Sequence, residues 1–145
     1  MTSDNIGKRD APPLWNDRLT IGHLDIDREH KRLFHIASRL FEANDAGISQ
    51  SDIGDILCEL ADYTGKHFAH EEFLMYQAKY PLCAEHVVKH WNFIQRLSLM
   101  INTYERAPHE VLQKLQSVII EWLLQHIMAD DMEFGEFWNK HHGSD

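Results

Sequence analysis

The chain has 145 residues, of which 43% are hydrophobic and 26% are charged, and it carries a formal net charge of −9 at pH 7. This length and composition are typical of one globular domain with a buried core. The acidic balance argues against nucleic acid as a partner, because binding to nucleic acid depends on cationic contacts to phosphates.

No segment has the pattern of a secretion signal or a membrane span. The N-terminal stretch MTSDNIGKRDAPP lacks an apolar region. The most apolar stretch, SVIIEWLL, is interrupted by Glu121 and is too short to cross a membrane. Cys58 and Cys83 fit no metal-binding spacing and are expected to be free thiols in a reducing compartment. We therefore expect a cytoplasmic protein.

An irregular N-terminal arm, residues 1–24, precedes the first helical pattern. Two consecutive prolines in the arm resist helix, and Trp15 can anchor it to a hydrophobic core. The first helix is expected to begin near Asp25 or Asp27, either of which can cap it, and to end at residues 44–47.

Three further helices follow, each with apolar residues at helical spacing. The second opens at Ser49 or Ser51 and stops before Pro81. The third spans about residues 83–104, and Pro108 starts the fourth.

Four helices joined by short connections bury their apolar faces best as an up-down-up-down four-helix bundle. We therefore predict an all-α protein whose bundle spans residues 25–140, with a short tail at residues 141–145.

Histidine is unusually frequent, with 11 residues, and every expected helix places at least one on its apolar face. His30 follows Ile26 by four residues, and residues i and i+4 of a helix differ in direction by only ~40°. The same spacing joins Glu71 to His67, whereas Glu72 lies off this face and is expected to be solvated. The inward-facing histidines are His30, His67, His86, His90 and His126. The remaining histidines, expected at the surface, are His23, His35, His70, His109, His141 and His142.

The inward-facing set predicts a metal site. A single histidine on an apolar face is usually a hydrogen-bonded core residue, and an HxxxH pair such as His86/His90 also occurs on surfaces. Five inward histidines with Glu71 are different, because without a ligand they would be buried polar groups with few partners. Five imidazoles are too many for one ion, and no thiolate accompanies them. Mixed imidazole and carboxylate in a bundle core suits a two-iron site.

Four segments carry these residues: IDREHKRLF, HFAHEEFLM, YPLCAEHVVKH and WLLQHIMADD. In this order they contain one histidine, an HxxxE pair, an HxxxH pair and an HxxxxD pair. Over roughly residues 14–138 the pattern resembles the hemerythrin family, and in particular its single-domain bacterial members. The sequence departs from the family's usual pattern at His23 and at Glu29, where glutamine is more common. Glu29 precedes the ligand candidate His30 and could alter the hydrogen bonding around the site.

The last carboxylate of the set depends on the resemblance. Helical spacing from His126 selects Asp130, at i+4, whereas the resemblance selects Asp131, at i+5. On a regular helix an i+5 pair lies about 140° apart, so Asp131 needs a local bulge or a lateral reach. We take Asp131 as the ligand and expect Asp130 to be a solvated neighbour.

The resemblance implies a di-iron centre with an oxo or hydroxo bridge and with Glu71 and Asp131 bridging the two irons. It also implies an unequal division of the histidines, which leaves one position open for dioxygen on the iron with fewer of them. One iron takes His86, His90 and His126, and the other takes His30 and His67. Apolar side chains would cover the oxygen and keep water out. The candidates for this lining are Phe68, Trp122, Leu123 and Ile127.

The function implied by the resemblance is reversible binding of dioxygen for storage or delivery, with no residue in a catalytic role. Two alternatives remain. The protein could sense oxygen, nitric oxide or iron through a docked protein partner, since these 145 residues contain no linked signalling domain. It could also use the same irons as an oxidase or peroxidase, although no residue clearly supplies a proton donor near the open position.

Overall fold

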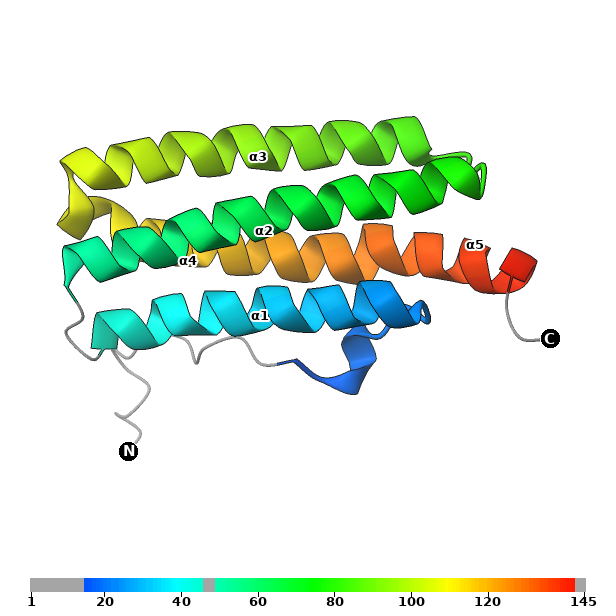
Figure 1. Cartoon of the computed structure of the whole chain (residues 1–145), viewed down its shortest axis with the longest axis horizontal. Coiled ribbons are helices and arrows are strands. Elements are labelled where there is room, and N and C mark those ends of the chain that lie inside the picture. The colour runs from blue at the N-terminus through cyan, green and yellow to red at the C-terminus, as the bar shows by residue number, and fades with distance from the viewer. Residues whose placement is uncertain (1–14, 46–48, 143–145) are drawn as a thin grey trace.

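The computed structural model describes residues 15–45 and 49–142. It consists of four long antiparallel helical segments, which we call rods (Figure 1). A short 3-10 turn, η2 (Asp17–Leu19), precedes α1 (Leu24–Asp45), α2 (Gln50–Gln77) and α3 (Cys83–Arg106). The fourth rod consists of α4 (Pro108–Gln125), a π-helical turn labelled η3 (His126–Asp131) and α5 (Met132–His142), which follow one another without a break.

The rods pack in chain order, α1 on α2, α2 on α3 and α3 on α4, and α4 closes the bundle against α1. This arrangement confirms the predicted all-α, up-down-up-down four-helix bundle. None of the described helices is both long enough and apolar enough to span a lipid bilayer.

The starts of the first two helices differ in how they are capped. Ser49 caps α2 as expected, because its hydroxyl accepts a hydrogen bond from the backbone N–H of Asp52 at 3.1 Å. Asp27 does not cap α1. Its carboxylate instead accepts hydrogen bonds from the backbone N–H groups of Ile21 at 2.8 Å and Gly22 at 3.2 Å, and so ties the arm to α1.

The hydrophobic core is divided into two clusters along the bundle axis. The first cluster fills the end near the α1–α2 connection and includes Leu40, Leu57 and Leu123. The second fills the opposite end, where α5 and the arm pack, and includes Phe34 and Phe134. Trp15 packs against the second cluster, with its ring 6.0 Å from that of Phe34, so the predicted anchoring of the arm is confirmed.

Buried polar residues separate the two clusters on every rod. In α1, for example, His30 lies between Ile26 of the second cluster and Leu33 of the first. In α2, His67 and Glu71 lie between Leu60 and Met75 in the same way. The fold therefore encloses one polar layer between two apolar ends.

Gly135 and Gly54 offer a matched test of how α5 holds the arm. A Cβ on Gly135 would overlap the backbone carbonyl oxygen of Ile21, whereas a Cβ on Gly54 would meet no atom within 4 Å. Gly135→Ala should therefore lower the unfolding temperature followed by circular dichroism. Gly54→Ala should raise the free energy of unfolding by about 0.5–1 kcal/mol, because alanine loses less backbone entropy in a helix. Equal stabilisation by both changes would contradict the close approach of α5 to the arm.

Candidate metal centre

The polar layer of the bundle is made of seven side chains that are almost completely buried. Their exposed fractions range from 0% to 4%. They come from all four rods, and the sequence analysis selected each of them. They are His30, His67, Glu71, His86, His90, His126 and Asp131.

These side chains form two overlapping groups. In each group, one ligand atom per residue lies within 4.8 Å of those of the other members. The larger group contains His86, His90 and His126, the smaller contains His30 and His67, and both contain Glu71 and Asp131. The geometry thus divides the histidines three to two around a shared pair of carboxylates, which is the division that the resemblance implies.

The Nε2 atoms of the histidines face the shared carboxylates. The Asp131 oxygens lie 3.0 Å from Nε2 of His30, 2.9 Å from that of His86 and 3.1 Å from that of His126. An oxygen of Glu71 lies 3.0 Å from Nε2 of His90.

Several of these atoms lack a hydrogen bond despite their proximity. Both ring nitrogens of His30, both oxygens of Asp131 and Oε2 of Glu71 are buried without a hydrogen-bond partner among the described residues. Such atoms are costly to bury unless something binds them. Imidazole nitrogens and carboxylate oxygens are the ligand atoms that iron accepts, so the residues fit a pair of metal ions.

The π-helical turn explains how Asp131 reaches the centre. An extra residue in the turn brings position i+5 back toward the face of His126, so that Asp131 is fully buried beside its Nε2. The local bulge expected from the HxxxxD spacing is therefore present. Asp130 points outward instead, with 21% of its side chain exposed.

Three further carboxylates hold the outer nitrogens of the histidines. Nδ1 of His67 donates to Glu29 at 2.7 Å, and Nδ1 of His90 donates to Glu72 at 2.7 Å. Nδ1 of His126 lies 3.1 Å from an oxygen of Asp130. A proton held on Nδ1 leaves Nε2 free to bind a metal and makes it a stronger donor.

Glu72 and Asp130 are thus partly exposed, with 29% and 21% of their side chains in contact with solvent, but the expectation of solvated neighbours missed their hydrogen bonds to His90 and His126. Both lie on the flank of a helix, as the periodicity indicates, but an imidazole is long enough for its Nδ1 to reach that flank. One signal was available in the sequence, because each carboxylate is adjacent to an inward-facing residue, as Glu29 is to His30.

The other histidines lie outside the centre. Nδ1 of His70, which is partly exposed, donates to the second oxygen of Glu29 at 2.6 Å. The ring of His23 packs 4.7 Å from that of Trp138, at the α5 end. His35, His141 and His142 are exposed as predicted, and the side chain of His109 falls outside the described residues.

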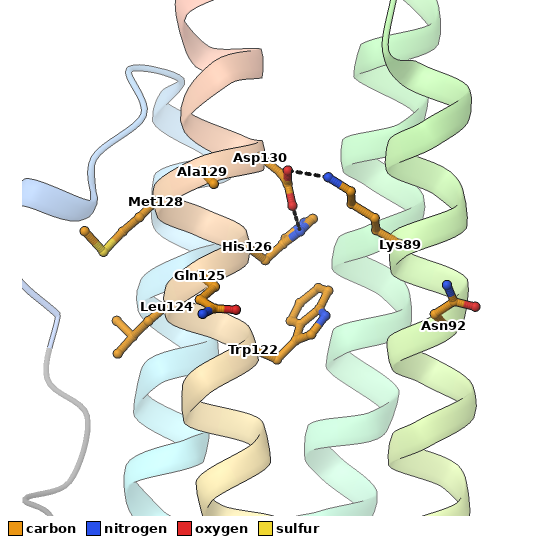
Figure 2. A pocket seen from close by; sticks show the side chains of 9 residues that line it. All are labelled: Lys89, Asn92, Trp122, Leu124, Gln125, His126, Met128, Ala129 and Asp130. Atoms are coloured by element: carbon orange, nitrogen blue, oxygen red, sulfur yellow. Dashed lines mark hydrogen bonds and ion pairs between the residues drawn. The ribbon is translucent and has the colours of Figure 1, made fainter.

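Two of the predicted lining residues pack against the three-histidine group. The ring of Phe68 stacks on His90 with centroids 3.7 Å apart, and the ring of Trp122 stacks on His126 at 4.2 Å. Trp122 also lines an open outer pocket between α3 and the fourth rod (Figure 2). Leu123 and Ile127 are buried in the first and second apolar clusters respectively, on either side of the polar layer. The four side chains therefore surround the layer and do not all cover one position.

Mutual contact shifts the pKa values of the buried groups. Burial alone would lower the pKa of His30, but the facing carboxylates of Asp131 and Glu71 raise it to about 9. The same balance raises the pKa of His86 to about 8. Burial would raise the pKa of Glu71, but the surrounding histidines hold it well below its usual value. Without metal, protons on His30 and His86 therefore balance charge on the carboxylates.

These shifts predict how the stability of the metal-free protein depends on pH. The lowered pKa of Glu71 contributes stability above its usual value of 4.5, and this is lost in acid. The raised pKa values of His30 and His86 contribute stability that is complete below their usual value of 6.5 and is lost as pH rises through about 8 to 9. The unfolding temperature of the metal-free protein should therefore peak between these usual values, 4.5 and 6.5. It should fall at alkaline pH, whereas the iron-loaded protein, with metal in place of the protons, should not show this alkaline loss. A flat alkaline profile for the metal-free protein would contradict the ion pairing.

Comparison with known proteins identifies a family to which the chain is similar. Residues 23–138 match the family model described as the hemerythrin HHE cation binding domain. A bacteriohemerythrin of Pseudomonas aeruginosa is 36% identical over 118 residues, which cover 81% of this chain and 76% of the relative. One of Stenotrophomonas maltophilia is 33% identical and covers 85% and 79%. Hemerythrin subunit 2 of Golfingia vulgaris is 32% identical and covers 85% and 90%.

A solved structure supports the same fold. A crystal structure of a leucine-to-phenylalanine mutant superposes with a TM-score of 0.79 at 25% identity, covering 88% of this chain and 97% of the other. The helical bundle is thus shared over nearly the whole of that chain.

Proposed function

The chain belongs to the hemerythrin family, whose domain binds oxygen at a non-haem di-iron centre, and we propose that it stores or delivers dioxygen by binding it reversibly. The observation that carries this proposal is the three-to-two division of the buried histidines around Glu71 and Asp131. An unequal division gives two metal positions that differ by one nitrogen ligand, so that one of them keeps a place for an exchangeable ligand.

In this proposal the two groups of histidines hold different irons. His86, His90 and His126 would hold one, His30 and His67 would hold the other, and Glu71 and Asp131, which belong to both groups, would be shared between them. When bound, the iron pair supplies one open coordination position and the electrons that dioxygen accepts reversibly. The open position would fall on the side of His30 and His67, because that group offers one nitrogen fewer.

The surrounding residues exclude water from this position. The two apolar clusters close the polar layer at both ends, with Leu123 and Ile127 exposing 3% and 1% of their surfaces. A dry surrounding slows the entry of protons and anions that would displace reduced oxygen and leave ferric iron. Retention of bound oxygen without turnover is what distinguishes a carrier from an oxidase.

The proposal predicts two irons per chain and reversible oxygen binding. Protein purified from iron-replete cells should contain two iron atoms per chain by metal analysis, because seven buried ligands suit two ions and not one. In stopped-flow measurements the anaerobic diferrous protein should bind oxygen, and removal of oxygen should restore the starting spectrum. A single tightly held ion, zinc alone or rapid consumption of oxygen would each reject the proposal.

Leu123 tests whether the apolar lining protects the bound oxygen. It lies one turn before His126, whereas Leu40 lies in the same apolar cluster but further from the centre. Leu123→Ala and Leu40→Ala should each cost about 2–5 kcal/mol of unfolding free energy, because both remove buried methyl groups. Only Leu123→Ala should accelerate the decay of the oxygenated protein to the ferric form, followed by absorbance. Equal decay rates in the two variants would mean that Leu123 contributes packing alone.

A further inference from the structure

We propose that the Asp130–Lys89 ion pair positions His126 from outside the centre and sets how tightly the three-histidine side holds its iron. This inference rests on the proposed di-iron function. Asp130 and Lys89 touch no metal in this proposal and act through the imidazole of His126.

The π-helical turn places consecutive aspartates on the two nitrogens of one imidazole. Asp131 lies 3.1 Å from Nε2 of His126 on the inner side, and Asp130 lies 3.1 Å from Nδ1 on the outer side. An ionised carboxylate can only accept a hydrogen bond, so Nδ1 carries the proton and Nε2 is left for the metal. The same bulge that delivers the inner carboxylate therefore also fixes the tautomer of the histidine beside it.

Lys89 links this arrangement to a different rod. Its Nζ lies 2.7 Å from the other oxygen of Asp130, so that one carboxylate joins α3 to η3 (Figure 2). The hydrogen bond from His126 is the main cause that lowers the pKa of Asp130 to about 2, burial opposes it, and the bond from Lys89 adds to it. The two oxygens of Asp130 are thus divided between the imidazole of His126 and the ammonium group of Lys89.

The pair also separates His126 from solvent. Lys89 and Asp130 line the open outer pocket together with Trp122, whose ring covers one face of the imidazole. The exposed fraction of the side chains falls from 53% at Lys89 to 21% at Asp130 and 3% at His126. The ammonium charge of Lys89 at the surface therefore acts on the buried imidazole of His126 through one carboxylate, that of Asp130.

The two members of the pair have opposite electrostatic effects on the iron. The carboxylate of Asp130 makes the imidazole a stronger donor and favours ferric over ferrous iron. The ammonium group of Lys89 draws charge away from that carboxylate and weakens the effect. Asp130 is paired with a lysine, whereas the contacts found for Glu29 and Glu72 among the described residues are with histidines.

The test compares Asp130→Asn with Lys89→Met in the iron-loaded protein. Two quantities are measured, namely the rate at which the reduced protein releases iron to a ferrous chelator under anaerobic conditions and the ferric/ferrous midpoint potential. Asp130→Asn should release iron about 10-fold faster or more, in line with the loss of a carboxylate partner behind a metal-binding histidine, and its potential should rise. Lys89→Met should release iron no faster than the unmodified protein, and its potential should fall.

Asp55→Asn and Lys114→Met serve as controls for the change in net charge. Both residues are exposed, on α2 and α4 respectively, and each precedes a centre histidine by 12 residues, or about 18 Å along a helix. Thermal unfolding of the metal-free variants, followed by circular dichroism, shows whether each one folds. Shifts in the controls as large as those in Asp130→Asn would overturn the inference.

A purely structural role for the ion pair gives a different result. If the pair only braced α3 against η3, both variants would speed iron release and move the potential in the same direction, and this outcome overturns the inference. Iron content of the unmodified protein separates the two proposals. A protein without two irons rejects the di-iron function itself, whereas intact iron with unchanged release and potential in Asp130→Asn rejects the role of the ion pair alone.

Discussion

The structure depends on one constraint, which is that seven ionisable side chains share a core closed to water. Five of them are imidazoles and two are carboxylates, none more than 4% exposed. Burying isolated charges of this kind costs far more than a domain of this size has in net stability. The groups must therefore neutralise one another. Without metal they do so with protons on histidines such as His30 and His86, and with metal the ions take the place of those protons.

The rest of the bundle is arranged around that requirement. Apolar clusters occupy the two ends, so each rod needs only one or two polar positions, placed at the same height. The position of the polar layer between the two apolar clusters also explains why the fourth rod is irregular. Asp131 has to enter the layer one residue later than a regular helix allows, and the π-helical turn at His126–Asp131 supplies that residue. The irregularity lies where the centre requires it, and the helices on either side are regular.

Much of this was predictable from the sequence, because the inward direction of a residue on a helix follows from its spacing. The bundle, the five inward histidines and Glu71 all came from that periodicity. Asp131 did not, since helical spacing alone favours Asp130, and only the resemblance to a family indicated the fifth position. Periodicity also misjudged Glu72, because it gives the direction of a residue but not the reach of a neighbouring imidazole.

Capping shows a related limit. A carboxylate near a helix start satisfies the local rule for a cap, but Asp27 accepts hydrogen bonds from the backbone N–H groups of Ile21 and Gly22, in the arm just before the helix. A carboxylate near a helix start can accept hydrogen bonds from the N–H groups of the helix or from those of the residues before it. The sequence pattern does not say which of the two it will choose. Two of the outer hydrogen bonds of the centre depend on packing instead. They join His67 to Glu29 and His90 to Glu72 on neighbouring helices, and they form only once these helices are packed.

The two sides of the centre differ in more than the number of histidines. On the three-histidine side, His90 and His126 each have an outer carboxylate and an aromatic ring stacked on the imidazole, provided by Phe68 and Trp122. On the other side, His67 shares Glu29 with His70, and Nδ1 of His30 has no hydrogen-bond partner among the described residues. The three-histidine side thus has two histidines with both an outer carboxylate and a stacked ring, and the other side has one histidine with an outer carboxylate that it shares. In the proposed function, a centre that keeps its metals and also exchanges a ligand has opposite needs at its two ions, and this unequal support would serve both. The histidines with outer partners and stacked rings would retain the ions, and the His30/His67 side would leave room for the exchangeable ligand.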